Sequence, residues 1–254
     1  MRPFAVAGLV VATVFAVGGC SGDDGAEPGP SWGSTAPIDG AAELTAAAKK
    51  LEEQSLRVAV TMPGAMDVSG VADAKKGRAD LTMKAGKAGG NRELRLLLVG
   101  ADFYLQIVGP EAAGLGLGKG DWLHLDASDV PADSPLNPRK IVDAQTFLGG
   151  MVKAEKVGAG SFKGVLDLGT VSAGSTAAPA SPGPAAEQVP FTARVDDQGR
   201  LTELVVEAGA RSESSGGGTV TTNYSDFGVP VTVQAPAKSK VREMPFQLRQ
   251  ALLS

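Results

Sequence analysis

The chain has 254 residues, of which 43% are hydrophobic, and a formal net charge of −4 at neutral pH. This composition is enough for a buried core, whereas an acidic balance without a Lys/Arg cluster argues against nucleic-acid binding. Aromatic residues make up only 5% of the chain, too few to favour the stacked Trp and Tyr faces typical of carbohydrate sites. Few aromatics and 34 glycines favour a strand-rich fold.

The first twenty residues have the layout of a bacterial secretory signal that ends in a lipid-modified cysteine. Arg2 precedes an uncharged apolar run over residues 5–17, which is too short for a mature transmembrane helix. The single cysteine of the chain, Cys20, follows two glycines. We therefore predict a signal peptide over residues 1–19 and lipidation at Cys20. An ordinary signal peptide with an incidental cysteine is the alternative.

The segment Val17-Gly18-Gly19-Cys20 resembles the lipobox of bacterial lipoproteins, with Val17 where Leu is usual. The resemblance implies that the Cys20 thiol takes up diacylglycerol and that Cys20 becomes the new N-terminus. It also implies anchoring, through acyl chains such as palmitate, to the extracytoplasmic face of the cell membrane. More than one acyl chain makes such an anchor stable. With no second cysteine, the folded part can contain neither a disulfide nor a cysteine-based metal site.

A tether and a helix are predicted after the cysteine. Residues 20–37 are rich in Gly, Pro and Ser with almost nothing to bury, which indicates a flexible tether. Asp39 is a candidate N-cap for a helix that reaches about Gln54, because apolar residues recur there at helical spacing. Apolar alternation between turn signals then predicts a series of strands. They lie at Leu56–Met62, Val68–Ala72, Ala79–Met83, Arg92–Val99, Asp102–Val108 and Asp121–Asp126.

The second half of the chain begins, in our interpretation, with loops and a helix. Residues 109–120 and 131–138 are predicted loops, and a helix is predicted from about Arg139 to Val152. An Ala/Pro/Ser/Gly-rich insert occupies residues 173–187, and residues 242–254 form a tail with a short helix. Four further strands are predicted, two of them after good hairpin signals. They lie near Gly160–Leu168, Val189–Asp196, Leu201–Ala208 and Thr219–Phe227.

Two main helices and nine or ten strands joined mostly by tight turns indicate one α+β domain, which we place at residues 38–241. The predicted architecture is a single antiparallel sheet, strongly curved because a sheet this wide must coil. Helices on its concave face would close off an apolar interior.

The order of these elements resembles the LppX/LprA/LprF/LprG lipoproteins of mycobacteria and other actinobacteria. The resemblance covers roughly residues 38–237 and depends on an ordered set of local matches. They are a strand with an early tryptophan at Gly120–Asp126, an Asn137-Pro138 helix entry, a strand pair around an acidic glycine turn at Val189–Leu201, and a last strand followed by Val-Pro-Val at Asn223–Val231.

This resemblance implies a half-barrel similar to the carrier LolA, with an apolar cavity that takes the acyl chains of lipids or glycolipids. It further implies transport of that ligand from the cytoplasmic membrane toward the outer envelope, with a membrane transporter as a possible partner. The segment between Leu168 and Val189 departs from the family, because it is rich in Ala, Pro and Gly where apolar helical residues are expected at the cavity mouth.

The candidate lipid-binding residues are the alternating apolar positions of the clearest strand pair and two positions on the predicted lid helix. A wide apolar lining supplies affinity through the hydrophobic effect, at roughly 25 cal/mol per Å² buried. A filled core would use the same residue types, so a non-catalytic structural or interaction lipoprotein remains the alternative. The candidates are Leu94, Leu96, Leu98, Phe103, Leu105, Ile107, Leu148 and Met151.

No catalytic, metal or cofactor site is predicted. The glycine-rich run Gly114–Gly120 lacks the Lys-Ser/Thr ending of a phosphate-binding loop and is interpreted as a loop at the cavity rim. His124 is the only histidine, which disfavours paired-histidine metal sites, and it is expected on the polar face of its strand. We interpret Asp196-Asp197 as part of a turn. The sequence therefore argues against an enzyme.

Overall fold

The computed structural model describes residues 38–87, 90–131, 134, 137, 144–169, 188–207 and 218–253. The predicted signal peptide, Cys20, the tether and the insert at 173–187 lie outside these residues. The chain divides into the units Met1–Ala36 and Pro37–Ser254, and every element below belongs to the second unit.

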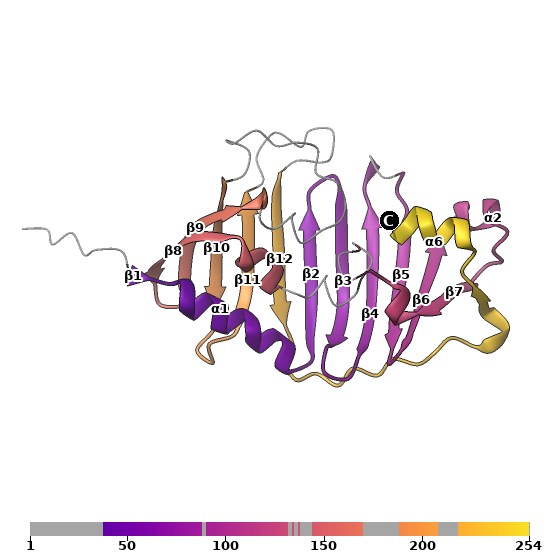
Figure 1. The fold of residues 1–254 in the computed structure, drawn as a ribbon, viewed down its shortest axis with the longest axis horizontal. Coiled ribbons are helices and arrows are strands. Elements are labelled where there is room, and N and C mark those ends of the chain that lie inside the picture. The colour runs from indigo at the N-terminus through magenta and orange to yellow at the C-terminus, as the bar shows by residue number, and fades with distance from the viewer. Residues whose placement is uncertain are drawn as a thin grey trace, which may run out of the picture. The chain divides into compact units, whose positions relative to one another are not determined.

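This unit is an α+β structure built on one open sheet, in which thirteen strands lie in the described residues (Figure 1). Their spatial order is β1-β8-β9-β10-β11-β12-β2-β3-β4-β5-β6-β7-β13. The strands are β1 (Ile38–Asp39), β2 (Leu56–Met62), β3 (Met66–Asp73), β4 (Arg78–Ala85), β5 (Glu93–Val99), β6 (Asp102–Val108), β7 (Trp122–Asp126), β8 (Met151–Gly158), β9 (Ser161–Asp167), β10 (Gln188–Val195), β11 (Leu201–Glu207), β12 (Thr219–Ser225) and β13 (Val241–Glu243).

The helices of the described residues are short. Helix α1 begins where Asp39 Oδ1 accepts the N–H of Ala41 at 2.9 Å, so Asp39 helps to cap it although Gly40 occupies the N-cap position. Helix α1 packs against β8, β10 and β11 and lies beside α4 (Figure 1). The helices are α1 (Ala41–Lys49), α2 (Glu111–Gly114), α4 (Ala144–Gly149) and α6 (Phe246–Leu253), with 3-10 turns at Lys50–Glu53, Ala127–Asp129 and Lys238–Lys240.

The hairpin β5–β6 has the register that its apolar alternation predicts. Leu94 pairs with Ile107, Leu96 with Leu105 and Leu98 with Phe103. Because successive side chains of a strand point to opposite faces, these partners share one face of the sheet. The prediction of this strand pair is confirmed.

Three predictions about the elements are wrong in part. The sheet is mixed, because β13 runs parallel to β7, whereas the other strand pairs in the described residues are antiparallel. The described part of the helix predicted to end at Val152 is α4, which ends at Gly149, and strand β8 starts at Met151. Two adjacent glycines explain the break, since glycine weakens a helix and commonly ends one. The loop predicted at 109–120 contains the short helix α2.

Apolar side chains gather in two clusters. The helix-side cluster joins α1 and α4 to the sheet through residues such as Leu44, Leu148 and Phe191. The strap-side cluster contains Leu97, Tyr104, Trp122, Val231 and Val233, and its last two members follow β12 in a segment without helix or strand. Leu97 belongs to this cluster while its neighbours Leu96 and Leu98 belong to the other, so the clusters occupy opposite faces of β5.

The segment predicted as a tail is part of the packed structure. Met244 is buried in the helix-side cluster, and Leu248 of α6 packs against it. The Met244 N–H donates to the carbonyl of His124 at 3.0 Å, which continues the parallel pairing of β13 with β7. Arg249 Nη1 lies 3.1 Å from Asp129 Oδ2. The C-terminal segment is therefore tied to the sheet by packing, backbone pairing and charge.

Candidate functional site

The predicted lipid-binding residues all lie in or against the helix-side cluster. Leu96, Phe103 and Leu105 are 0% exposed, and Leu98 and Leu148 are also buried. The remaining three, Leu94, Ile107 and Met151, are half-buried and pack against the cluster. The predicted residues thus share one apolar cluster, in which Leu94 and Ile107 are half-buried partners on β5 and β6 while Leu148 and Met151 lie on α4 and β8.

Met151 reaches the cluster from an element other than the predicted one. It is the first residue of β8 and pairs with Leu166 of β9. Met151 also lines a cavity of about 310 Å³ at the sheet edge, together with Asp39, Ala41 and Val152. Leu148, by contrast, lies on helix α4 as predicted.

A larger cavity, of about 530 Å³, opens where β6 ends. The chain leaves β6 at Val108, forms α2 and returns through the glycine-rich loop to β7. Ile107 belongs to the cavity wall and also packs against the helix-side cluster, so the two apolar regions meet at this side chain. The wall is formed by Gln106, Ile107, Val108, Gly109, Pro110, Ala112, Ala113, Leu117, Gly118, Lys119 and Gly120. We call this space the α2 pocket.

A buried carboxylate orders the glycine-rich side of the α2 pocket. Asp121, whose side chain is 7% exposed, accepts the N–H of Gly118 through Oδ2 at 2.9 Å. The N–H of Asp121 donates in turn to the carbonyl of Gly118 at 3.0 Å, which closes a tight turn. Lys240 Nζ and Arg242 Nε lie 3.7 and 3.8 Å from the Asp121 carboxylate. The loop is therefore held to the C-terminal segment by charge.

Sequence reasoning placed this loop at a cavity rim but missed the helix within it. Pro110 followed by Glu111-Ala112-Ala113 was the available signal, because proline and an acidic residue are common where helices begin. The alternating Gly and Leu residues that follow concealed it. Ile107 is thus the predicted lipid-binding residue that the structure places at the α2 pocket.

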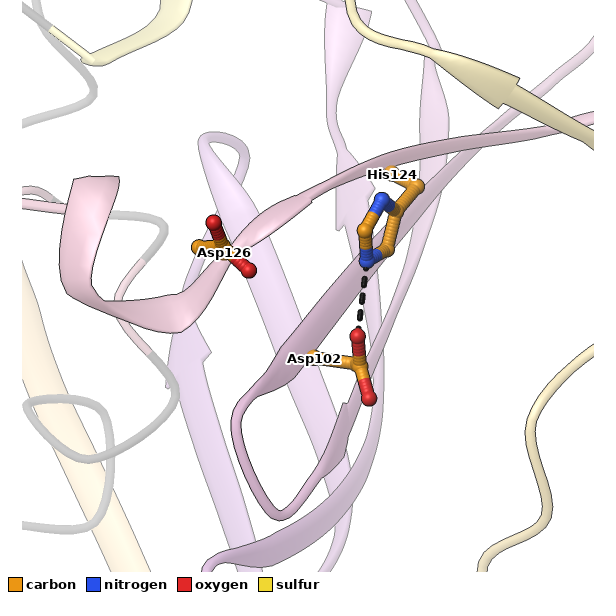
Figure 2. A group of neighbouring side chains, drawn as sticks. All are labelled: Asp102, His124 and Asp126. Carbon is orange, nitrogen blue, oxygen red and sulfur yellow. Dashed lines mark hydrogen bonds and ion pairs between the residues drawn. The ribbon is translucent and has the colours of Figure 1, made fainter.

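A group of polar side chains lies on the face of β7 that points away from the helix-side cluster (Figure 2). Figure 2 shows His124 beside Asp102 of β6, with His124 Nε2 and Asp102 Oδ1 2.8 Å apart, and Asp126 two residues further along β7. His124 Nδ1 lies 3.2 Å from Oε1 of Glu243 on β13. The neighbours of His124 along β7, Leu123 and Leu125, are buried in the helix-side cluster, which confirms that His124 occupies the more polar face.

The surroundings of His124 favour its charged form. Partial burial opposes the charge, but hydrogen bonds to Asp102 and Glu243 outweigh it and raise the pKa of the imidazole. The ligand atoms of Asp102, His124 and Asp126 lie within 4.8 Å of one another, a spacing that a metal ion could bridge. Both ring nitrogens already face carboxylates, however, and we interpret the group as an ion-pair junction between β6, β7 and β13.

The His124 junction predicts a pH-dependent stability. Because the folded-state pKa of His124 is raised, its contribution is fully present below the unfolded pKa of about 6.5 and is lost as pH rises through the folded value. We expect the difference in unfolding free energy between the wild type and His124→Gln to shrink from pH 5.5 to pH 9. Urea unfolding followed by circular dichroism measures it. A difference that grows with pH would contradict the junction.

The acidic pair near residue 196 forms a turn, as predicted. Asp196 Oδ1 accepts the backbone N–H groups of Gln198 and Arg200 at 3.0 and 2.9 Å. Burial raises the pKa of the Asp196 carboxyl, but hydrogen bonds from Arg200 outweigh this effect and lower it. Gly199 has a φ of 71°, which suits glycine at this turn between β10 and β11. Both oxygens of the Asp196 carboxylate therefore accept hydrogen bonds that hold the turn together.

Comparison with known proteins gives no family for this chain. No protein-family model matches it, and no curated protein matches it significantly. Within the described residues, no helix is long and apolar enough to cross a bilayer.

Proposed function

We propose that this chain is a cell-envelope lipoprotein that binds acyl lipids or glycolipids and carries them from the cytoplasmic membrane toward the outer envelope. The observation that carries the proposal is the α2 pocket, whose volume of about 530 Å³ lies within the roughly 300–1,000 Å³ usual for ligand sites. Its wall is mainly apolar, and it adjoins the helix-side cluster at Ile107. A membrane transporter is the proposed partner for loading or release.

The proposed architecture is a half-barrel of the LppX/LprG type, with helices on the concave face of the sheet. The burial of Leu44 and Leu148 from helices α1 and α4 against sheet residues supports this arrangement. The proposed ligand extends from the α2 pocket toward Leu94, the half-buried partner of Ile107 on β5. No catalytic role is proposed, because the described histidine is engaged by two carboxylates.

A filled-core structural or interaction lipoprotein is the second candidate. The complete burial of Leu96, Phe103 and Leu105 favours it, because a wide chamber over β5 and β6 would leave these side chains accessible. The two candidates differ in whether the protein retains lipid.

Lipid retention is tested on the full-length chain with Cys20→Ser, which cannot be acylated at that position. Native mass spectrometry followed by solvent extraction should show added mass that resolves into acyl lipids. A clean apo mass without uptake of a fluorescent fatty acid would instead favour the filled-core candidate.

The anchor itself is tested by metabolic labelling with an alkyne analogue of palmitate. We expect label on the wild type and its complete loss in Cys20→Ser, because the thiol is the proposed acceptor of diacylglycerol. Ser21→Ala is the matched control and should remain labelled and membrane-bound. Equal labelling of all three proteins would contradict lipidation at Cys20.

A further inference from the structure

The α2 pocket is apolar on the β6 and α2 sides and cationic at the loop. Ile107, Val108 and Pro110 line one side, Ala112 of α2 another, and Lys119 belongs to the loop wall. An apolar wall and a lysine thus line one space, an arrangement that suits a ligand with an apolar end and an anionic end. This asymmetry carries the inference.

The positive charge at the loop is incompletely neutralised. Lys240 Nζ donates to the backbone carbonyl of Lys119 at 3.1 Å, which brings the ammonium of Lys240 to the loop. Asp121 is shared between Lys240 and Arg242. Within the part of the chain that the structure describes, Lys119 forms no ion pair. One buried carboxylate therefore faces more than one cation at this side of the pocket.

A second acidic side chain, Glu111, lies near the pocket at the turn between β6 and α2. A Cβ added to Gly109 would lie 2.7 Å from Glu111 Oε2, which places that carboxylate over the turn between β6 and α2. Glu111 precedes the residues of α2 that line the pocket. Glu111 thus lies at the α2 side of the pocket, whereas Lys240 meets the backbone of Lys119 at the loop.

We propose that the α2 pocket takes an amphiphile with one acyl chain and an anionic head group. The chain packs along Ile107, Ala112 and Leu117, and the carboxylate or phosphate of the head pairs with Lys119 and the neighbouring Lys240. The pocket ends at packed residues, because Leu105, on the same face of β6 as Ile107, is completely buried. The volume of about 530 Å³, within the range usual for one small ligand, is the basis for assigning a single chain to this space. This inference depends on the proposed lipid-binding function and specifies the ligand class.

The experiment compares an acid with its neutral ester on the full-length Cys20→Ser protein. Binding of cis-parinaric acid and of its methyl ester is followed by their fluorescence. We expect the acid to bind more tightly by about two- to fivefold, the advantage that an exposed ion pair confers. Lys119→Ala should reduce the advantage of the acid over the ester and leave the affinity of the ester unchanged. Lys49→Ala, an exposed lysine of α1, is the matched control and should change neither.

The outcomes separate the inference from the function on which it depends. Equal binding of acid and ester by the wild type overturns the anionic head group but leaves lipid binding intact. Failure of both probes to bind overturns both proposals. Displacement of the acid by palmitate points to a carboxylate head, and displacement by a lysophosphatidylglycerol to a phosphate, and each supports the inference. If methyl palmitate displaces cis-parinaric acid as effectively as palmitate does, the inference is overturned.

Discussion

Replacing Phe103 with alanine is expected to lower the free energy of unfolding by about 3–5 kcal/mol. The ring is 0% exposed, and the residue pairs with Leu98 within the helix-side cluster. Truncation removes the transfer energy of the ring and leaves a cavity that the neighbouring strands cannot fill, because paired strands hold their spacing. Urea unfolding of the purified protein, followed by circular dichroism, gives the change directly.

The matched control for Phe103→Ala is Val152→Ala. Val152 is 56% exposed on β8, and its truncation should stay within about 0.5 kcal/mol of the wild type. If Phe103→Ala also cost less than about 1 kcal/mol, the ring would face an open chamber rather than packed neighbours. That outcome would extend the lipid-binding space from the α2 pocket across β6, and it would exclude the filled-core candidate.

The sequence predicts the centre of the sheet better than its edges. Strands β5 and β6 carry large apolar residues at every second position, from Leu94 to Leu98 and from Phe103 to Ile107. They are joined at Gly100, whose φ of 68° suits a tight turn, so their local pattern favours the observed register. Strand β13 has no comparable signal. Its position is fixed by contacts with a residue far away in the sequence: Glu243 interacts with the His124 ring, and the N–H of Met244 donates to the His124 carbonyl.

Strand β8 was missed because its first residues continue a helical spacing. Met151 and Val152 fall on the apolar stripe that Ala144 and Leu148 begin, and only the glycine pair between them marks the change. The pairing of β8 with β9 then decides the conformation. Tertiary pairing overrides local periodicity here, as is common for short segments.

The candidate site shows a different limit of sequence reasoning. Leu105 and Ile107 alternate on one face of β6 and are equivalent in the sequence, yet Leu105 is buried whereas Ile107 lines the α2 pocket. Residue type cannot tell which of the two lines a cavity, because cavity walls and cores use the same apolar side chains. Their difference arises from the chain that follows, which turns away at Gly109 and leaves space under α2.

Filling the α2 pocket is expected to have the largest effect on ligand binding. Ala113 lines the pocket and is exposed on α2, so Ala113→Trp places an indole in the space without disturbing the helix-side cluster. Excluding only two methylene groups of an acyl chain, at about 0.8 kcal/mol each, weakens binding by roughly tenfold or more. Fluorescence titration with cis-parinaric acid and with its methyl ester should show the loss for both probes, because the chain is displaced whatever its head group.

The control for this prediction is Ala46→Trp, because Ala46 is an exposed alanine of α1. Both variants should unfold within about 0.5 kcal/mol of the wild type, as is usual for surface substitutions. Loss of binding in Ala113→Trp alone would locate the acyl chain at the end of β6. Undiminished binding in Ala113→Trp would move the ligand elsewhere, and the cavity lined by Met151 at the sheet edge would be the next site to fill.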